Sequence, residues 1–325
     1  MTLRESFSIM LLDGISKGIK HRLAEVEVSS IRDIVVRGEM NISESTGLSL
    51  DTCRRLCNKA RSTLEQKGVL HTPFTSGINK RFEAISFGSK SLDNLLGGLG
   101  VRTGAITELF GGSNVGKTQL CHTLCVMVQL PLGQGGLNGS AIYIDTESSF
   151  TPERIYSIAE ARGLDKEKAS KNVIVARPMS SLEQEHYMER AGSVIDRHEN
   201  IKLLVIDSVI SLYRAEYIGR AALPERQQRL YRHMQMLRRI SEVYRVAVVV
   251  TNQVNQTPEE LTGPIPKPTG GNIMAHASTY RIRLRQFDYR RLAELIHSPY
   301  LPEDHVHFGI SAQGTYDVQD PQPLS

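Results

Sequence analysis

Residues 105–130 read Ala-Ile-Thr-Glu-Leu-Phe-Gly-Gly-Ser-Asn-Val-Gly-Lys-Thr-Gln-Leu-Cys-His-Thr-Leu-Cys-Val-Met-Val-Gln-Leu, and this stretch decides the fold. The apolar run Ala105–Phe110 predicts a buried strand, and Lys117–Leu130 predicts a helix. Between them stands Gly111–Thr118, a complete G-x-x-x-x-G-K-[ST] pattern. A glycine-rich turn between a strand and a helix directs backbone N–H groups at an anion, so the stretch predicts a phosphate-binding loop.

Each part of this motif has a chemical role in binding a nucleotide. The glycines let backbone N–H groups wrap the phosphates, Lys117 brings positive charge to the β and γ oxygens, and the Thr118 hydroxyl reaches Mg²⁺. The alternative, a glycine-rich turn with a surface lysine, does not explain the position between strand and helix. We therefore expect ATP and Mg²⁺ as ligands. The residues predicted to hold the nucleotide are Gly111, Gly112, Ser113, Asn114, Val115, Gly116, Lys117, Thr118 and Gln119.

Three later strand ends carry polar side chains suited to the same site. Asp207 follows the apolar run Leu203–Ile206, as in the B motif of P-loop ATPases, where the carboxylate holds Mg²⁺ through water. Glu147 follows another strand and is placed to polarise the water that attacks the γ-phosphate, although a surface acid at a strand end is the alternative. Gln253 follows a third strand and is a candidate to bind the γ-phosphate and report its loss.

The pattern after residue 82 predicts an α/β fold with a mostly parallel sheet covered on both faces. Helical stretches, including Pro152–Arg162 and Gln227–Tyr244, separate short β-branched runs. These runs are Ala105–Phe110, Ala141–Ile144, Val173–Val175, Leu203–Ile206 and Val246–Thr251. Three later runs alternate polar with apolar residues, so we expect them to extend the sheet as antiparallel hairpins. These are Tyr280–Arg285, Arg291–Ile296 and His305–Ser311.

The N-terminal part predicts a separate small helical domain. Residues 12–67 form short helical patterns with glycine turns, and Ser49 is expected to cap a helix with Cys53, Cys57, Ala60 and Leu64 on one face. A helix–glycine turn–helix unit can hold a DNA backbone phosphate, and a protein-binding helical bundle is an equally good interpretation. We assign residues 1–70 to this domain, 71–82 to a linker and 83–325 to the ATPase core.

Composition excludes several other classes of protein. The 325 residues are 40% hydrophobic and 23% charged, which is unlike collagen, disordered chains or coiled coils. Apolar runs are too short to cross a bilayer, and no secretory signal is recognisable, so we expect an intracellular protein. The four cysteines form two i,i+4 pairs, Cys53/Cys57 and Cys121/Cys125, which favours buried thiols over a zinc site.

The net charge of +4 is too small to identify a nucleic-acid partner by itself. Residues 1–80 hold 12 Lys/Arg and 9 Asp/Glu, a net of +3, and residues 81–325 hold 27 and 26, a net of +1. The excess of positive charge therefore lies in the N-terminal part.

Several stretches together resemble one known family, the RecA/RadA recombinases. They are Glu108–Gln119, Gly135–Phe150, Glu216–Gln228 and Thr251–Val254. The resemblance is nearest to the archaeal members and their eukaryotic relatives, and it covers residues 83–317 in register and the N-terminal helices more loosely. Because several motifs occur in order, the resemblance is far more specific than the phosphate-binding loop alone.

The resemblance implies a RecA-like core and a helix-hairpin-helix-type N-terminal domain. It further implies an ATP-dependent filament on single-stranded DNA that pairs this strand with a homologous duplex in recombinational repair. Lys117 and Glu147 would then be catalytic, Gln253 would couple the γ-phosphate to DNA binding, and Arg154 would stack on the adenine. The segment Ser298–Pro302, with Pro302, would cover ATP bound to the neighbouring subunit.

The resemblance also implies two DNA-binding loops and a set of partners. The first loop would be Tyr213–Arg229, and the second would be Asn255–Gly271 with Gly270 and Gly271 as its flexible return. Arginines suit phosphate neutralisation, and those of the first loop are Arg214, Arg220, Arg226 and Arg229. Expected partners are single-stranded and double-stranded DNA, further copies of the chain in a filament or ring, and recombinase paralogues or mediators, in the cytoplasm or nucleoid of an archaeon.

Some positions depart from the family pattern. Leu261-Thr262 stand where archaeal relatives usually carry aromatic residues, and the second loop has a net charge of −1 from Glu259, Glu260 and Lys267. Asn272 and His297 replace a usual histidine and aspartate. The Phe-x-x-Ala polymerisation motif is matched only by Phe74–Gly77, so one methyl group is missing from the subunit contact.

These departures leave a second interpretation open, a recombinase paralogue that acts as a mediator or regulator. The intact phosphate-binding loop, Glu147, Asp207 and Gln253 favour the recombinase itself. A ring-forming DNA motor or signalling ATPase is the third interpretation, but it does not explain the stretch Glu216–Gln228.

Overall fold

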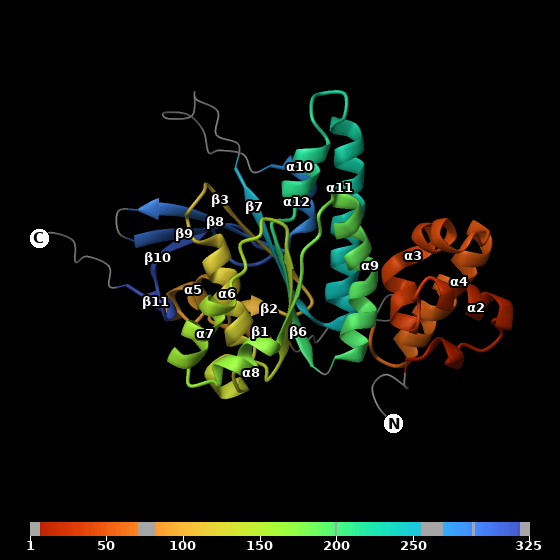
Figure 1. The fold of residues 1–325 in the computed structure, drawn as a ribbon, viewed down its shortest axis with the longest axis horizontal. Helices are drawn as coiled ribbons and strands as arrows, with labels where there is room; N and C mark the ends of the chain where they lie inside the picture. Colours follow the sequence, from red (N-terminus) through yellow and green to blue (C-terminus); the bar gives the residue numbers. More distant parts are fainter. Residues whose placement is uncertain (1–6, 71–81, 199, 255–268, 288–289, 319–325) are drawn as a thin grey trace, which may run out of the picture.

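A computed structural model describes residues 7–70, 82–198, 200–254, 269–287 and 290–318 (Figure 1). Its main sheet has nine strands in these ranges, in the order β11-β10-β9-β8-β3-β7-β6-β4-β5. They are β3 (Ile106–Gly111), β4 (Ser140–Asp145), β5 (Val173–Ala176), β6 (Ile201–Asp207), β7 (Ala247–Gln253), β8 (Tyr280–Phe287), β9 (Arg290–His297), β10 (Asp304–Ser311) and β11 (Gly314–Asp317). A separate antiparallel pair joins β1 (Ala84–Ile85) to β2 (Val101–Arg102).

The parallel strands are confirmed, and one of the later strands differs from the expectation. β8 runs parallel to β3, whereas β9, β10 and β11 continue the sheet in antiparallel hairpins. The reason is the connection before β8, since the helix α12 (Gly271–Ala277) carries the chain back to the starting edge of the sheet. The pattern of alternating residues does not contain this information because both strand directions produce it.

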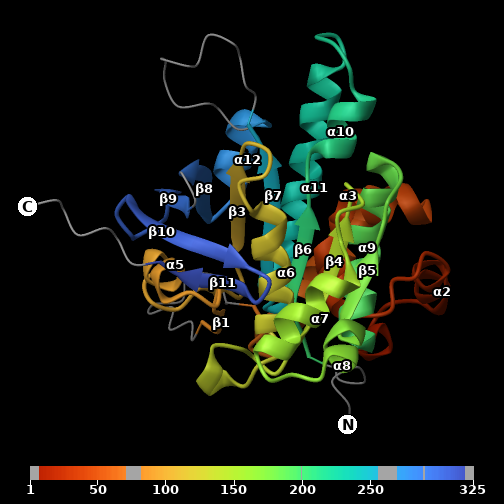
Figure 2. The same cartoon turned by 60° about the vertical axis from the view of Figure 1, so that its left-hand side comes forward.

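Helices cover both faces of the sheet (Figure 2). α6 (Lys117–Met127) and α7 (Pro152–Ala161) pack on one face, with α5 (Lys90–Leu95) and α8 (Lys166–Lys171) beside them. α9 (Ser181–Arg197) and α11 (Leu223–Tyr244) pack on the other face. α6 is buried from Leu120 to Met127 and the β3 residues are buried throughout, so the phosphate-binding loop joins two rigid elements.

The N-terminal helices are α2 (Lys17–Glu25), α3 (Ile31–Thr46) and α4 (Leu50–Gln66), after the short 3-10 helix η1 (Ile9–Leu11). Ser49 caps α4 by accepting a hydrogen bond from the Thr52 N–H, which confirms the predicted start of this helix. α3 begins with a reciprocal capping box between Ser30 and Asp33, which was not predicted. Cys53 is buried and Cys57 is half-buried, and the four cysteines of the chain are free thiols.

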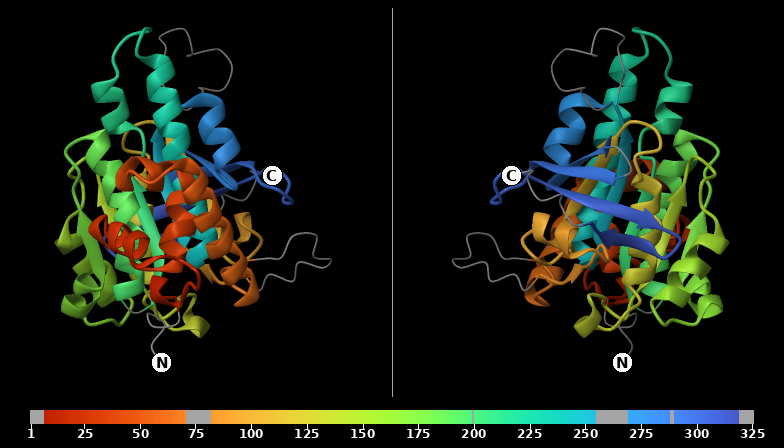
Figure 3. Two further views of the ribbon diagram at one scale, coloured as in Figure 1. Left: turned by 90° about the vertical axis from the view of Figure 1, so that its right-hand side faces the viewer. Right: turned by 90° about the vertical axis from the view of Figure 1, so that its left-hand side faces the viewer.

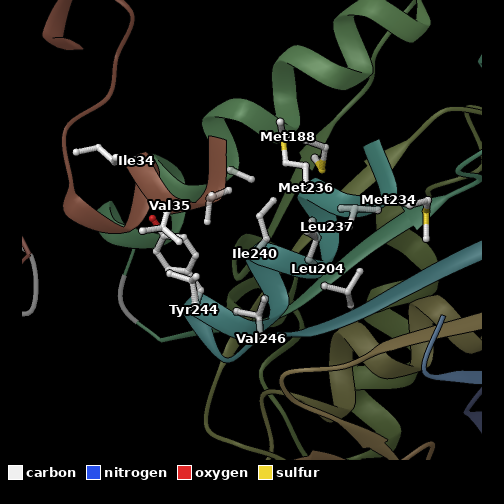
Figure 4. Close-up of a cluster of buried hydrophobic side chains, with 14 of the residues drawn as sticks. Ile34, Val35, Met188, Leu204, Met234, Met236, Leu237, Ile240, Tyr244 and Val246 are labelled. Atoms are coloured by element: carbon white, nitrogen blue, oxygen red, sulfur yellow. The ribbon is translucent and has the colours of Figure 1, made fainter. Parts of the chain in front are cut away.

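The N-terminal helices share one hydrophobic cluster with α9 and α11. Figure 3 shows these helices lying against the core. Val35 of α3 lies beside Tyr244 of α11 in this cluster (Figure 4). The helical part therefore packs on the face of the core opposite α6. The expected linker, except for Phe82, lies outside the described residues, and so does Phe74. None of the described helices combines the length and the hydropathy that crossing a bilayer requires.

Candidate functional site

The phosphate-binding loop connects the end of β3 to the start of α6, as the sequence predicted. Gly116 has φ +104° and caps α6, a backbone conformation that side chains other than glycine rarely adopt. A Cβ atom on Gly111 would collide with the Leu284 carbonyl of β8. Both glycines are therefore required for the loop to turn between strand and helix.

The Lys117 side chain lies inside this loop. Its Nζ donates to the carbonyl oxygens of Gly111 (3.0 Å) and Gly112 (2.6 Å). Burial lowers the pKa of Lys117, and the nearby carboxylates of Asp207 and Glu147 oppose that change. The Lys117 ammonium group therefore lies inside the loop whose backbone N–H groups are predicted to bind an anion.

Asp207 lies at the end of β6, is 2% exposed and accepts several hydrogen bonds. Its Oδ2 accepts from the Thr118 hydroxyl (2.7 Å) and the Tyr143 hydroxyl (2.7 Å), and its Oδ1 accepts from the Thr251 hydroxyl. Tyr143 was not predicted, and its only sequence signal is a hydroxyl group within a buried apolar strand. The convergence of the Thr118 hydroxyl with a carboxylate suits Mg²⁺, which prefers oxygen ligands and retains waters. The described residues contain no group of three or more His, Cys, Asp and Glu side chains that would favour another metal.

Glu147 and Gln253 are brought together beside this loop. Glu147 Oε1 accepts from the Gln253 amide (3.1 Å) and from the Ser208 hydroxyl (2.8 Å). The Gln253 Oε1 accepts in turn from Arg214 Nη1 at 3.2 Å. Three predicted residues from three separated segments therefore form one hydrogen-bonded chain. Ser208, which orients Glu147, was not predicted.

A cluster of buried polar side chains joins the two ends of the segment that follows Gln253. Asn252 donates to Glu108 Oε1 (2.8 Å) and to the Thr269 carbonyl (2.7 Å), and its own Oδ1 accepts from the Gln253 N–H (2.8 Å). Glu108 is fully buried and forms an ion pair with Arg281 at 2.6 Å. The sequence contained a signal for this group, because Glu108 interrupts the apolar run of β3.

Arg154 and Pro302 were both predicted to contact the nucleotide, and they lie in separate parts of the subunit. Arg154 on α7 donates to the carbonyl oxygens of Ser311 and Ala312, both at 2.6 Å, and burial lowers its pKa. Pro302 is exposed in the connection between β9 and β10. This connection lies at the starting edge of β3, because His297 pairs with Arg281 near the start of β8. It is about 20 Å from the phosphate-binding loop of the same subunit along the strand direction.

The segment 213–229 is more helical than a loop. α10 (Ser211–Glu216) ends at residue 216 and α11 begins at Leu223, where Pro224 suits the first turn of a helix. Arg214 and Arg220 are exposed and Arg226 is half-buried. Arg229 forms an ion pair with Glu185 at 2.8 Å and also donates to the Tyr217 hydroxyl, so its guanidinium group is already engaged.

The second expected DNA loop lies outside the described residues from 255 to 268. At its end, Thr269 N donates to the Gln253 carbonyl at 2.9 Å, so the two ends of the segment meet. Gly270, with φ +88°, caps α12, Gly271 opens that helix, and Asn272 is exposed on it.

A sequence model of the Rad51 family matches residues 79–318. The DNA repair and recombination protein RadA of Cenarchaeum symbiosum (strain A) is 42% identical over 322 residues, which cover 97% of this chain and 80% of that protein. The protein of the same name from Metallosphaera sedula is 37% identical over 312 residues, which cover 95% of both chains. This protein therefore belongs to the Rad51 family, the RecA/RadA recombinases that its sequence motifs resemble.

Proposed function

We propose that this protein is a DNA-dependent ATPase that assembles on single-stranded DNA with ATP bound and promotes homologous pairing and strand exchange. The observation that carries this proposal is the hydrogen-bonded chain from Glu147 through Gln253 to Arg214. It joins the residue placed for hydrolysis to the segment expected to bind DNA. A nucleotide site without a DNA-coupled role would not require this connection.

The residues divide the chemistry of ATP hydrolysis. Lys117 binds phosphate oxygens, and Thr118 with Asp207 would hold Mg²⁺, which stabilises the charge that develops on the phosphates. Glu147 accepts the proton of the attacking water while the bond between the γ-phosphorus and the ADP oxygen breaks. The Gln253 amide can donate either to Glu147 or to a γ-phosphate oxygen. Because Arg214 donates to the Oε1 of the same side chain, a change of nucleotide state also changes the contact of Arg214.

The position of Pro302, away from the phosphate-binding loop of its own subunit, supports a proposal about assembly. We propose that Ser298–Pro302 covers the nucleotide of a neighbouring subunit, because this segment lies at the sheet edge opposite its own phosphate-binding loop. The site of one subunit would then be complete only in a filament or ring. ATP binding would stabilise subunit contacts, and hydrolysis would release them.

Strand exchange tests the proposal directly. The purified protein is incubated with single-stranded DNA, a labelled homologous duplex, Mg²⁺ and ATP, and a heterologous duplex serves as control. We expect strand displacement that requires homology. If folded protein that binds ATP displaces no strand alone but stimulates a separate recombinase, the protein is a mediator paralogue and the proposal is wrong.

A further inference from the structure

A cleft of about 400 Å³ lies between the N-terminal helices and the core, away from the nucleotide site. α3 and α4 form one wall and α11 forms the other. Four arginines line it, Arg37 and Arg61 from the N-terminal helices and Arg232 and Arg239 from α11. The lining has a single acid, Glu39, so these charged groups sum to +3.

None of the four arginines forms an ion pair among the described residues. Glu39 pairs with Arg54 at 3.7 Å, so it does not neutralise them. Arg37 is only 4% exposed, and its Nε is buried with no hydrogen-bond partner in the described structure. Burial raises the pKa of Asp33 and of Glu189 and the charge of Arg37 opposes this rise, so these carboxylates lie near Arg37 without forming an ion pair with it. A buried guanidinium donor with no hydrogen-bond partner is still costly, which indicates that an anion completes the site.

The backbone of α3 is shaped around this cleft. Gly38 has φ +75° and interrupts the helix, and a Cβ atom there would collide with the Arg239 guanidinium group. Arg239 therefore lies against the kink and donates to the Arg37 carbonyl at 3.4 Å. Burial lowers the pKa of Arg239, and the positive charge of Arg61 acts in the same direction. A bound anion would remove this repulsion between neighbouring arginines.

We propose that this interdomain cleft binds a phosphate group, with Arg37 and Arg239 at its floor and Arg61 and Arg232 at its rim. A guanidinium group binds phosphate oxygens through paired hydrogen bonds, so four arginines around one cleft are suited to bind a phosphate group. The phosphate can come from a DNA backbone or from a free phosphate ion. α11 favours the DNA backbone, because it runs from Arg226 at the first expected DNA segment to Arg239 in the cleft, about 20 Å along one helix.

The first experiment uses inorganic phosphate and does not depend on the proposed DNA function. Thermal unfolding is followed with the nucleotide site saturated by Mg²⁺ and a slowly hydrolysed ATP analogue, at constant ionic strength. The exposed rim is removed in the variant Arg61→Ala/Arg232→Ala. The matched control Arg55→Ala/Arg238→Ala removes two exposed arginines of α4 and α11 that pair with Asp51 and Glu242.

We expect phosphate to raise the Tm of the wild type and the control by roughly 4 °C at 100 times its Kd, and to leave the rim variant unchanged. An equal rise in all three proteins overturns the proposal. A rise with poly-glutamate but not with phosphate also overturns it and indicates an acidic protein ligand.

The second experiment identifies the source of the phosphate. Oligonucleotide affinity is measured at several salt concentrations for the same three proteins. Loss of two DNA contacts lowers the slope of log affinity against log salt by about 2 in the rim variant alone. An unchanged slope together with a lost phosphate response assigns the cleft to a free phosphate ion.

Discussion

At the scale of single residues, the site depends on side chains whose positions are set by the backbone around them. Lys117 is held by the carbonyl oxygens of its own loop, and the Asn252 side chain holds the backbone N–H of Gln253. Each is therefore in place before a ligand arrives, so little ordering is needed when ATP binds. Two substitutions test this directly.

Lys117→Ala should lower nucleotide affinity at least about tenfold, because the variant loses a charged donor to the phosphates. Nucleotide-dependent assembly should be lost with it. Titration of a fluorescent ATP analogue and light scattering measure the two effects. Lys171→Ala, on α8, is the control, and an unchanged affinity in Lys117→Ala would exclude the assigned role.

Glu147→Gln should slow ATP hydrolysis by about 100-fold or more while the ATP-bound assembly persists. The amide keeps the size of the side chain but cannot accept the proton of the attacking water. Phosphate release and the lifetime of DNA-bound assemblies measure the two effects, with Glu153→Gln on α7 as control. Assemblies that dissociate as fast as those of the wild type would count against Glu147 as the base.

At the scale of elements, α11 performs several tasks along its length. Its start carries Arg226, its middle buries His233 and Met234 against the core, and its end places Tyr244 against the N-terminal helices. A single helix thus connects the expected DNA segment, the sheet and the helical part. A titratable side chain that α11 buries should therefore make the stability of the protein depend on pH.

His233 should make the protein sensitive to acid between pH 6.5 and 4. Burial lowers the pKa of His233 to about 4, its Nε2 accepts from Gln184 (3.2 Å), and its Nδ1 has no partner among the described residues. Because the unfolded histidine binds a proton near pH 6.5 and the folded one does not, the free energy of unfolding falls as the pH decreases through this range. The loss due to this group is about 2 kcal/mol at pH 5.

His233→Gln should remove this part of the pH dependence. Urea unfolding at pH 7 and pH 5 measures it, and the comparison uses the change between the two pH values in each protein. His305→Gln, at an exposed position, is the control. Equal changes in wild type and His233→Gln would show that another group causes the acid sensitivity.

Arg220→Ala/Arg226→Ala should weaken DNA binding and lower its salt slope by about 2, since two phosphate contacts are lost. Arg229 is left in place because it already pairs with Glu185. Fluorescence anisotropy with labelled single-stranded DNA measures the slope. Lys168→Ala/Lys171→Ala on α8 has the same charge change, and the two variants should differ clearly.

At the scale of the whole molecule, a cluster of polar side chains joins the N-terminal helices to the core. Tyr244 donates to Asp33 Oδ1 (3.0 Å) and Asp196 Oδ2 (3.2 Å), and Arg32 pairs with Asp196 at 3.3 Å. Burial raises the pKa of Asp33, and the charge of Asp196 raises it further. Gly192 permits this approach, because a Cβ atom there would collide with Asp33.

Tyr244→Phe should destabilise this contact by about 1–3 kcal/mol, because two buried carboxylates lose the one hydroxyl proton that they share. The loss should appear first in the N-terminal helices, as faster hydrogen exchange of the α3 amides, while β3 and β7 remain protected. Tyr316→Phe, at a position that is 46% exposed, serves as control. Uniformly faster exchange across both parts would show that they unfold as one unit.

The sequence by itself determined the features that depend on neighbouring residues. Gly111–Thr118, the alternation of strands and helices, and the cap at Ser49 follow from local patterns, and so do the strand ends at Asp207 and Gln253. Parallel strands end at one edge, so Glu147, Asp207 and Gln253 were expected at one site. The sequence indicates only that these residues share one edge of the sheet, because the end of a strand does not specify which side chains contact one another.

The tertiary structure alone decided which distant groups meet. Tyr244 and Asp33 are 211 residues apart, and the partners of Glu108 and of Arg214 also come from other elements. An apolar stripe on α11 shows that the helix is buried, but the same stripe would suit the sheet or the N-terminal helices. The direction of β8 and the arginine-lined cleft depend on how whole elements dock, because such contacts arise from packing and not from sequence neighbours.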